Sequence, residues 1–172
     1  DPLYRSFNYG NLVDVIMLDT RLAGREEQIY PQNDADTADW LAPDRTILGE
    51  DQKNWLKDQL LNSTAKWKVI GNQVMFSEFN VGWAADGFPV DTVTFASLEN
   101  TFLDIWDGYP AERDTILDFI TDNGIDNVVF ATGDFHASFA FDVAKRPTIF
   151  NPWGMPPITT RLHKMVLLPL SF

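Results

Sequence analysis

Residues 46–77 read TILGEDQKNWLKDQLLNSTAKWKVIGNQVMFS, and two hydrophobic patterns follow one another within them. In the first half, apolar side chains recur at the spacing of an amphipathic helix, at Leu48, Trp55, Leu56 and Leu60. Asn62 and Ser63 end that pattern. The second half, residues 66–77, predicts a strand with core candidates at Val69, Ile70, Val74 and Phe76. A helix that leads directly into a strand is typical of an α/β fold.

The same alternation continues on both sides of this stretch. Residues 11–21, NLVDVIMLDTR, carry a dense apolar run that is typical of a largely buried strand. Residues 109–124, YPAERDTILDFITDNG, predict a second helix that begins near Pro110 and ends near Gly124. The apolar run in residues 126–132, DNVVFAT, predicts the next strand. This order of elements predicts one α/β domain built on a layered sheet.

Three segments do not follow the alternation. Residues 24–43 are polar and predict a long loop, and residues 82–108, which have no clear periodicity, predict an irregular excursion. From residue 145 the chain is rich in proline and contains the basic run TTRLHK. We therefore expect residues 1–144 to form the domain and residues 145–172 to form an irregular tail, which is either a packed extension or a product of truncation.

Composition and charge argue against several classes of protein. The chain has 172 residues, 45% of them hydrophobic, which is enough for one globular domain with a core. A formal net charge of -12 argues against a nucleic-acid-binding module and against docking on an anionic membrane. Cysteine is absent, so thiolate nucleophiles and cysteine zinc sites are excluded. The sequence contains no run of 18 or more apolar residues, so it predicts no membrane span, and no signal peptide opens it.

The segment ATGDFHAS, residues 131–138, contains the strongest candidates for chemistry. Asp134 and His136 come just after the end of a predicted strand, where open α/β sheets bind their ligands. A carboxylate and an imidazole separated by one residue can reach one cation, and they suit zinc, manganese or ferric iron. The alternative is a surface-loop histidine bound by a neighbouring carbonyl group. No G-x-S-x-G elbow, Walker loop or dinucleotide fingerprint offers other enzyme machinery.

Three segments together resemble a known family. They are YRSFNYGNLVDVIMLDTR at 4–21, RTILGEDQKNWLKDQLLNSTAKWKVIGNQVMFS at 45–77 and WDGYPAERDTILDFITDNGIDNVVFATGDFHAS at 106–138. In this order they look like the C-terminal part of the metallophosphatase domain of PhoD-type alkaline phosphatases, which are also described as phosphodiesterases. The motifs LG-x-x-Q-x-x-WL, WDGYPAER and GD-x-HAS are each modest, and their ordered combination makes the resemblance specific.

The resemblance implies a fold, a reaction and a set of ligands. The fold would be part of a calcineurin-like metallophosphatase β-sandwich flanked by helices. The reaction would be the hydrolysis of phosphomonoesters or phosphodiesters at a centre containing iron and calcium, with Asp134 and His136 as metal ligands. The superfamily also has a ligand after the strand VIGNQV, where Asn72 or Gln73 stands here. Gln73 is the favoured site-facing residue, and its alternative is a strand-end amide bound by the backbone. The family also implies a secreted, periplasmic or cell-surface location.

The sequence departs from the family in one respect. The aspartate-rich segments that carry the family's first metal ligands do not occur before Tyr4. Residues 1–144 are therefore expected to be the C-terminal portion of the domain, which would need the N-terminal part of the same protein to complete its site. Two alternatives stay open: a catalytically incomplete structural half, and a simple carboxylate-rich calcium-binding module.

Arg21 is the remaining candidate for catalysis. It ends the predicted strand in the sequence LDTR, where its guanidinium group could neutralise oxygens of a phosphoryl group in the transition state. The alternative is an arginine that is paired with Asp19 or with an acidic residue of a loop.

Overall fold

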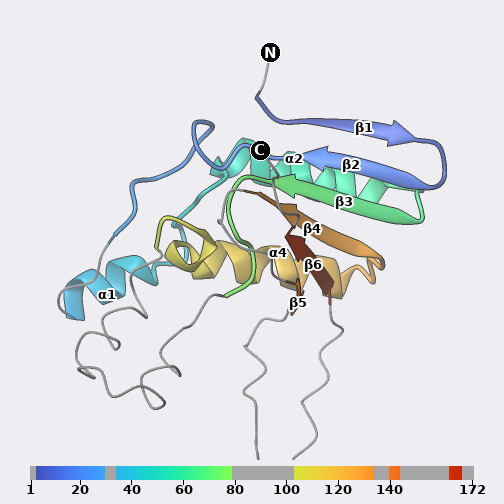
Figure 1. Ribbon diagram of the computed structural model, residues 1–172. Helices are drawn as coiled ribbons and strands as arrows, with labels where there is room; N and C mark the ends of the chain where they lie inside the picture. The colour runs from blue at the N-terminus through green and yellow to red at the C-terminus, as the bar shows by residue number, and fades with distance from the viewer. Residues whose placement is uncertain (1–2, 30–33, 79–102, 134–139, 144–162, 168–172) are drawn as a thin grey trace, which may run out of the picture.

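A single sheet organises the computed structural model, which describes residues 3–29, 34–78, 103–133, 140–143 and 163–167 (Figure 1). The strands lie in the order β1-β2-β3-β4-β6-β5. Neighbours among β2, β3, β4 and β6 are parallel, and the edge strands β1 and β5 are antiparallel to their neighbours. Their bounds are β1 Arg5–Tyr9, β2 Val13–Met17, β3 Trp67–Asn72, β4 Val128–Thr132, β5 Ala140–Val143 and β6 His163–Leu167.

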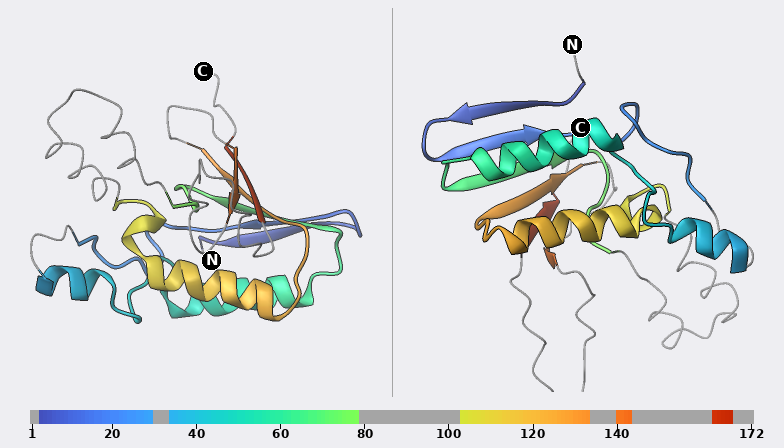
Figure 2. Two further views of the ribbon diagram at one scale, coloured as in Figure 1. Left: turned by 90° about the horizontal axis from the view of Figure 1, so that it is seen from below. Right: turned by 180° about the vertical axis from the view of Figure 1, so that it is seen from behind.

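Two long helices connect the parallel strands. Helix α2, Gly49–Asn62, lies between β2 and β3 in the chain, and α4, Pro110–Asp122, lies between β3 and β4. Both cover the same face of the sheet, as the view from below shows (Figure 2). They share a face because β2, β3 and β4 are added in one direction, and right-handed crossovers place both of these connections on the same side. The predicted α/β class is confirmed.

The predicted helices begin and end near the expected signals. The second helix starts at Pro110, whose missing N–H costs nothing in a first turn. It stops before Asn123 and Gly124, and Gly124 takes a positive φ of 62° that suits glycine. The polar segment 24–43 differs from the prediction, because a short helix, α1 (Asp34–Trp40), forms inside the expected loop.

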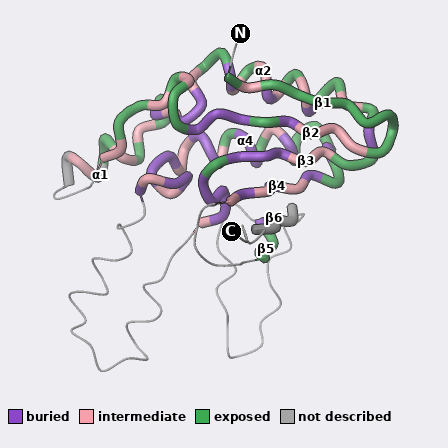
Figure 3. The backbone as a smooth tube through the Cα atoms, turned by 45° about the horizontal axis from the view of Figure 1, so that its top comes forward, coloured by how far each residue is buried: buried purple, intermediate pink, exposed green. Residues whose placement is uncertain are grey.

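The core lies between the sheet and the two long helices. Ile16, Ile70 and Phe130 are partners across β2, β3 and β4, and each is fully buried. The ring of Phe76 stacks on Phe130 at 3.7 Å between centroids and meets Trp106 edge-on at 4.8 Å. Buried residues lie along β2, β3 and β4 and in the segments that come directly after these strands, whereas β1 is exposed (Figure 3). The aromatic cluster therefore fills the core beneath the carboxyl ends of β3 and β4.

The opposite face of the sheet differs from the sequence prediction. The dense apolar run from Leu12 to Leu18 predicts a largely buried strand, yet Leu12 is 61% exposed and Met17 is 37% exposed. Only one face of β2 packs against α2 and α4, so Ile16 is its fully buried residue, and Leu18 is buried directly after the strand. None of the described helices covers the other face, and the second sheet of the expected sandwich is not among the described strands.

The tail also differs from the prediction over five residues. Residues 145–172 are expected to be irregular, but β6 pairs with β4 on one side and β5 on the other. Within β6, Val166 is a residue type that favours strands, a signal that the proline-rich context hides. None of the helices within the described ranges is long and apolar enough to cross a membrane.

Candidate functional site

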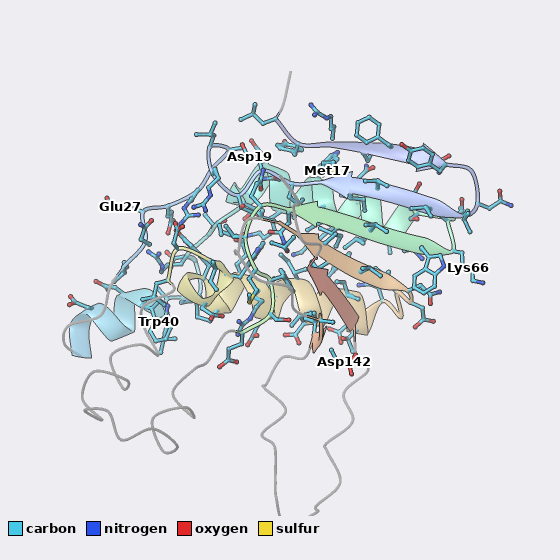
Figure 4. All side chains as sticks on the ribbon, viewed as in Figure 1. Met17, Asp19, Glu27, Trp40, Lys66 and Asp142 are labelled. Atoms are coloured by element: carbon cyan, nitrogen blue, oxygen red, sulfur yellow. The ribbon has the colours of Figure 1, made fainter. Side chains whose placement is uncertain are left out.

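The carboxyl ends of β2, β3 and β4 meet at one edge of the sheet. Asp19 lies at this end and Lys66 at the opposite end (Figure 4). Asn72 and Thr132 are register partners at the ends of β3 and β4. The predicted metal ligands Asp134 and His136 follow directly, but they lie outside the described residues, and their role stays a prediction. In the part of the chain that the structure describes, no group of three or more His, Asp or Glu side chains is placed to hold a metal ion.

Asp19 organises the turn that follows β2. Its carboxylate accepts hydrogen bonds from the backbone N–H groups of Arg21, Leu22 and Ala23, at 2.9–3.1 Å. The side chain of Gln52 fixes the same residue from α2, because it accepts from the Asp19 N–H at 2.7 Å and donates to the Asp19 carbonyl at 2.8 Å. Asp19 is buried, so these bonds replace water around its charge. The turn that presents Arg21 is therefore held on both sides.

Arg21 is bound by an acidic residue far away in the sequence. Its Nη1 lies 2.8 Å from both carboxylate oxygens of Asp104. This is the loop acid that the alternative interpretation of Arg21 predicts. The Arg21 side chain is nevertheless 42% exposed at the carboxyl edge of the sheet.

Three further residues support that pair. Arg25 donates to the same Asp104 carboxylate at 2.8 Å, and its side chain is only 9% exposed. The fully buried ring of Tyr109 lies between two arginines, with Arg25 5.4 Å and Arg45 4.9 Å from its centroid. Burial raises the pKa of the Tyr109 hydroxyl above its usual value of 10.0, although both arginines oppose that shift. Tyr109 is therefore a neutral support, and its hydroxyl group donates to the carbonyl of Glu26.

Sequence reasoning missed Asp104 and Arg25. Asp104 is separated from Arg21 by 83 residues and from Arg25 by 79. Neither lies in a recognisable motif, and Asp104 belongs to a stretch without periodicity, so no local pattern indicates the pairing.

Asn72 is engaged inside the protein. Its Nδ2 donates to Thr132 Oγ1 at 3.0 Å, and its Oδ1 accepts from Trp106 Nε1 at 3.0 Å. The Thr132 hydroxyl continues the chain to the Val74 carbonyl at 3.3 Å. All these groups are buried, so the network ties the ends of β3 and β4 together directly before Gly133.

Gln73 ties β3 to the turn after β2. Its Oε1 accepts from both the N–H and the hydroxyl of Thr20, at 2.9 Å and 2.8 Å, and its Nε2 donates to the Leu18 carbonyl at 3.0 Å. This is the strand-end amide of the alternative interpretation. Both the oxygen and the nitrogen of the Gln73 amide make hydrogen bonds, although the residue is exposed.

Glu112 is a buried carboxyl group whose role is structural. It accepts from the Thr46 hydroxyl at 2.7 Å and from the N–H groups of Ile47 and Leu48 at 2.6 Å and 3.2 Å. Burial raises its pKa, and these hydrogen bonds oppose the rise. Because both oxygens hold the segment that leads into α2, Glu112 is not placed to transfer protons to a substrate.

Comparisons with known proteins extend this description. The sequence profile of a family described as PhoD-like phosphatase matches residues 1–161. Alkaline phosphatase D of Bacillus subtilis (strain 168) is 38% identical over 138 residues, which cover 80% of this chain and 22% of the relative. A solved structure described as the structure of PhoD matches with a TM-score of 0.68 at 31% identity, over 96% of this chain and 28% of its own. The chain therefore spans less than a third of the length of either relative.

Proposed function

The chain belongs to the PhoD-like phosphatase family, and from this premise we propose that it forms the carboxyl-edge half of a site that hydrolyses phosphate esters with the help of metal ions. The 38% identity to a protein named alkaline phosphatase D supports the reaction class. The observation that carries the location is the convergence of β2, β3 and β4 at one sheet edge, directly before Asp134 and His136. The substrates are small phosphomonoesters or phosphodiesters.

Asp134 and His136 are the proposed metal ligands. Their carboxylate and imidazole groups suit ferric iron, and the carboxylate also suits calcium. Metal ions held there would supply an activated water molecule and would neutralise charge on the phosphoryl oxygens. The buried network of Asn72 and Thr132 fixes the strand end from which this segment departs.

Arg21 is the proposed contact for the phosphoryl group. It follows β2, which lies two strands away from β4, and its side chain is 42% exposed at the same edge. A guanidinium group can donate two parallel hydrogen bonds to a phosphoryl group, and charge-assisted bonds of this kind are the stronger ones. Its task is to stabilise negative charge that builds up on those oxygens during the reaction.

A metal analysis combined with a phosphatase assay tests this proposal. We expect the purified protein to retain iron or calcium in stoichiometric amounts and to hydrolyse p-nitrophenyl phosphate. His136→Ala should lower activity at least about 100-fold and release the iron, because a direct ligand matters no less than its supporting residues. His163→Ala is the matched control, since His163 is the other of the two histidines, and it should keep both properties. Metal retention and turnover that survive His136→Ala would contradict the proposal.

The second candidate is a structural half that completes its site only with further polypeptide. The chain spans 22% of the B. subtilis relative, and the open face of its sheet is apolar. This candidate predicts neither stoichiometric metal nor turnover for the chain alone, and both for a polypeptide of the relative's length. A simple calcium-binding module instead predicts calcium-dependent melting that persists after His136→Ala.

A further inference from the structure

A single carboxylate joins the exposed Arg21 to the interior of the protein. Both oxygens of Asp104 lie 2.8 Å from Arg21 Nη1, and Oδ1 also lies 2.8 Å from Arg25 Nη2. The two arginines differ in exposure, at 42% for the Arg21 side chain and 9% for Arg25. Asp104 is therefore shared between one arginine at the surface and one that is nearly buried.

Arg25 holds Asp104 in place independently of Arg21. Its Nη1 donates to the Thr20 carbonyl at 3.0 Å, and its Nη2 donates to the Asp104 carbonyl at 3.1 Å. Its guanidinium group lies over the fully buried ring of Tyr109. Because Arg25 contacts both the backbone and the carboxylate of Asp104, that carboxylate is directed toward Arg21 before any ligand binds.

Asp104 engages only part of the Arg21 guanidinium group. All of its contacts are to Nη1, and among the described residues neither Nε nor Nη2 of Arg21 makes a hydrogen bond. The N–H groups of Nε and Nη2 lie on the same edge of a guanidinium group, and this edge forms bidentate pairs with oxyanions. Asp104 thus holds Arg21 by one side and leaves a two-donor edge open.

The shared carboxylate does not balance both arginines. Arg21 and Arg25 each carry +1 and Asp104 carries -1. The carboxylate of Asp19 in the same turn carries the other negative charge, but its oxygens accept from the backbone N–H groups of Arg21, Leu22 and Ala23.

We propose that Asp104 is a positioning residue that orients Arg21 for two unesterified oxygens of a phosphoryl group. The inference rests on the proposed function, because it assigns a role to the Arg21 contact at that site. A phosphodiester has two such oxygens and a phosphomonoester has three, so the pairing fits either class. Asp104 acts through Arg21 and does not itself touch the substrate.

Protection of Arg21 from phenylglyoxal by inorganic phosphate tests this role without requiring turnover. Peptide mass spectrometry would measure the phosphate concentration that halves modification of Arg21. Asp104→Asn should raise that concentration about three- to tenfold, since a charged partner is replaced by a neutral one. Asp104→Glu, which keeps the carboxylate, should restore part of the protection. Glu50→Gln removes an equal charge from the exposed pair with Lys53 and should change nothing.

The opposite results would overturn the proposal. If Asp104→Asn leaves the protecting concentration unchanged, the carboxylate does not position Arg21. If it lowers that concentration, Asp104 competes with phosphate for the arginine instead of orienting it.

A double-mutant cycle separates positioning from a general effect on the fold. In an Arg21→Lys background, Asp104→Asn should cause no further loss in kcat/KM for p-nitrophenyl phosphate, because its effect passes through Arg21. If Asp104→Asn lowers kcat/KM as much in the Arg21→Lys background as in the wild type, Asp104 acts on the loop, and the proposal is overturned. A wild-type protein that lacks turnover would contradict the proposed function, whereas phosphate protection of Arg21 that weakens in Asp104→Asn would still support the role of Asp104.

Discussion

Glu112 stabilises the fold through its hydrogen bonds and destabilises it through the burial of its charge. Its carboxylate satisfies the Ile47 and Leu48 N–H groups and the Thr46 hydroxyl, which otherwise would lack partners in the interior. Burial opposes the charged form and raises the pKa above its ordinary value of 4.5. The folded state therefore holds the Glu112 proton more tightly than the unfolded state does. This difference stabilises the fold at low pH, and the stabilisation is lost as pH rises through the folded-state pKa.

Glu112→Gln should remove that pH-dependent cost. Its carbonyl oxygen can accept the two backbone N–H groups, and its NH₂ group can donate to the Thr46 hydroxyl. The free energy of unfolding of the variant, relative to wild type, should rise in urea denaturation as the pH increases above 4.5, the ordinary pKa of the group. Glu112→Ala is the contrasting variant, and it should lose about 1–3 kcal/mol because buried donors lose their acceptor. A difference between Gln variant and wild type that stays constant with pH would contradict this prediction.

Asn72 is the second residue whose role depends on buried partners. Asn72→Leu removes the acceptor of the Trp106 indole N–H and the donor to Thr132. We expect a loss of about 2–3 kcal/mol in the free energy of unfolding, because buried polar groups are left without partners. Thermal or urea unfolding would measure it. In a Trp106→Phe background the same substitution should cost clearly less, and an equal cost would show that the indole contact is unimportant.

At the scale of elements, two glycines determine how closely the turn after β2 approaches α2. Gly24 and Gly49 have positive φ angles of 82° and 73°. A Cβ atom on Gly24 would lie 2.7 Å from the Cα of Gly49, closer than real Cβ contacts. The same turn begins at Asp19 and carries Arg21 and Arg25. The close approach of the two backbones therefore helps to position the candidate site.

Gly24→Ala should destabilise the protein more than Gly10→Ala does. Both glycines have positive φ, so both substitutions incur a conformational cost of about 1–2 kcal/mol. A Cβ on Gly10 meets nothing within 4 Å, whereas a Cβ on Gly24 meets the backbone of Gly49. Chemical denaturation of the two variants would isolate the clash, and equal losses would mean that the contact between turn and helix relaxes without cost.

At the scale of the whole molecule, the sheet has one face covered by helices and one that the described elements leave open. Its central strands are parallel, and sheets of this kind are usually covered on both faces. The open face carries apolar side chains from β1, β2 and β3, including Phe7, Tyr9, Met17 and Trp67, each 37–64% exposed. Exposed apolar surface of this kind commonly marks a place of contact.

The 172-residue chain should therefore bind a hydrophobic dye such as anilinonaphthalene sulfonate. Replacing Phe7 and Met17 with lysine should lower the dye fluorescence by about half or more, since it interrupts the apolar patch. Leu61→Lys is the control, because Leu61 is 55% exposed on α2, away from this face. Equal fluorescence from the double variant and the control would show that the open face is not accessible in solution.

Local pattern was enough to predict the two long helices and the three central strands of this fold. Helical spacing in residues 46–60, together with Pro110 and Gly124 at the ends of the second helix, predicted α2 and α4, and apolar runs predicted β2, β3 and β4. These features can be predicted from the sequence because they depend on residues only a few positions apart. The same segments carry the family resemblance, which the match over residues 1–161 confirms. Strand β6 was missed because its five residues lie in a proline-rich context that favours irregular structure.

The contacts of the candidate site were decided by the tertiary structure alone. Arg21 meets Asp104 across 83 residues, Gln73 meets Thr20 across 53 and Trp106 meets Asn72 across 34. A charged or polar side chain takes whichever partner the fold brings within about 3 Å, and hydrogen-bond reach has no periodic signature in the sequence. Local sequence thus determined α2, α4 and the three central strands. Only their packing determined which side chains meet at the carboxyl edge of the sheet.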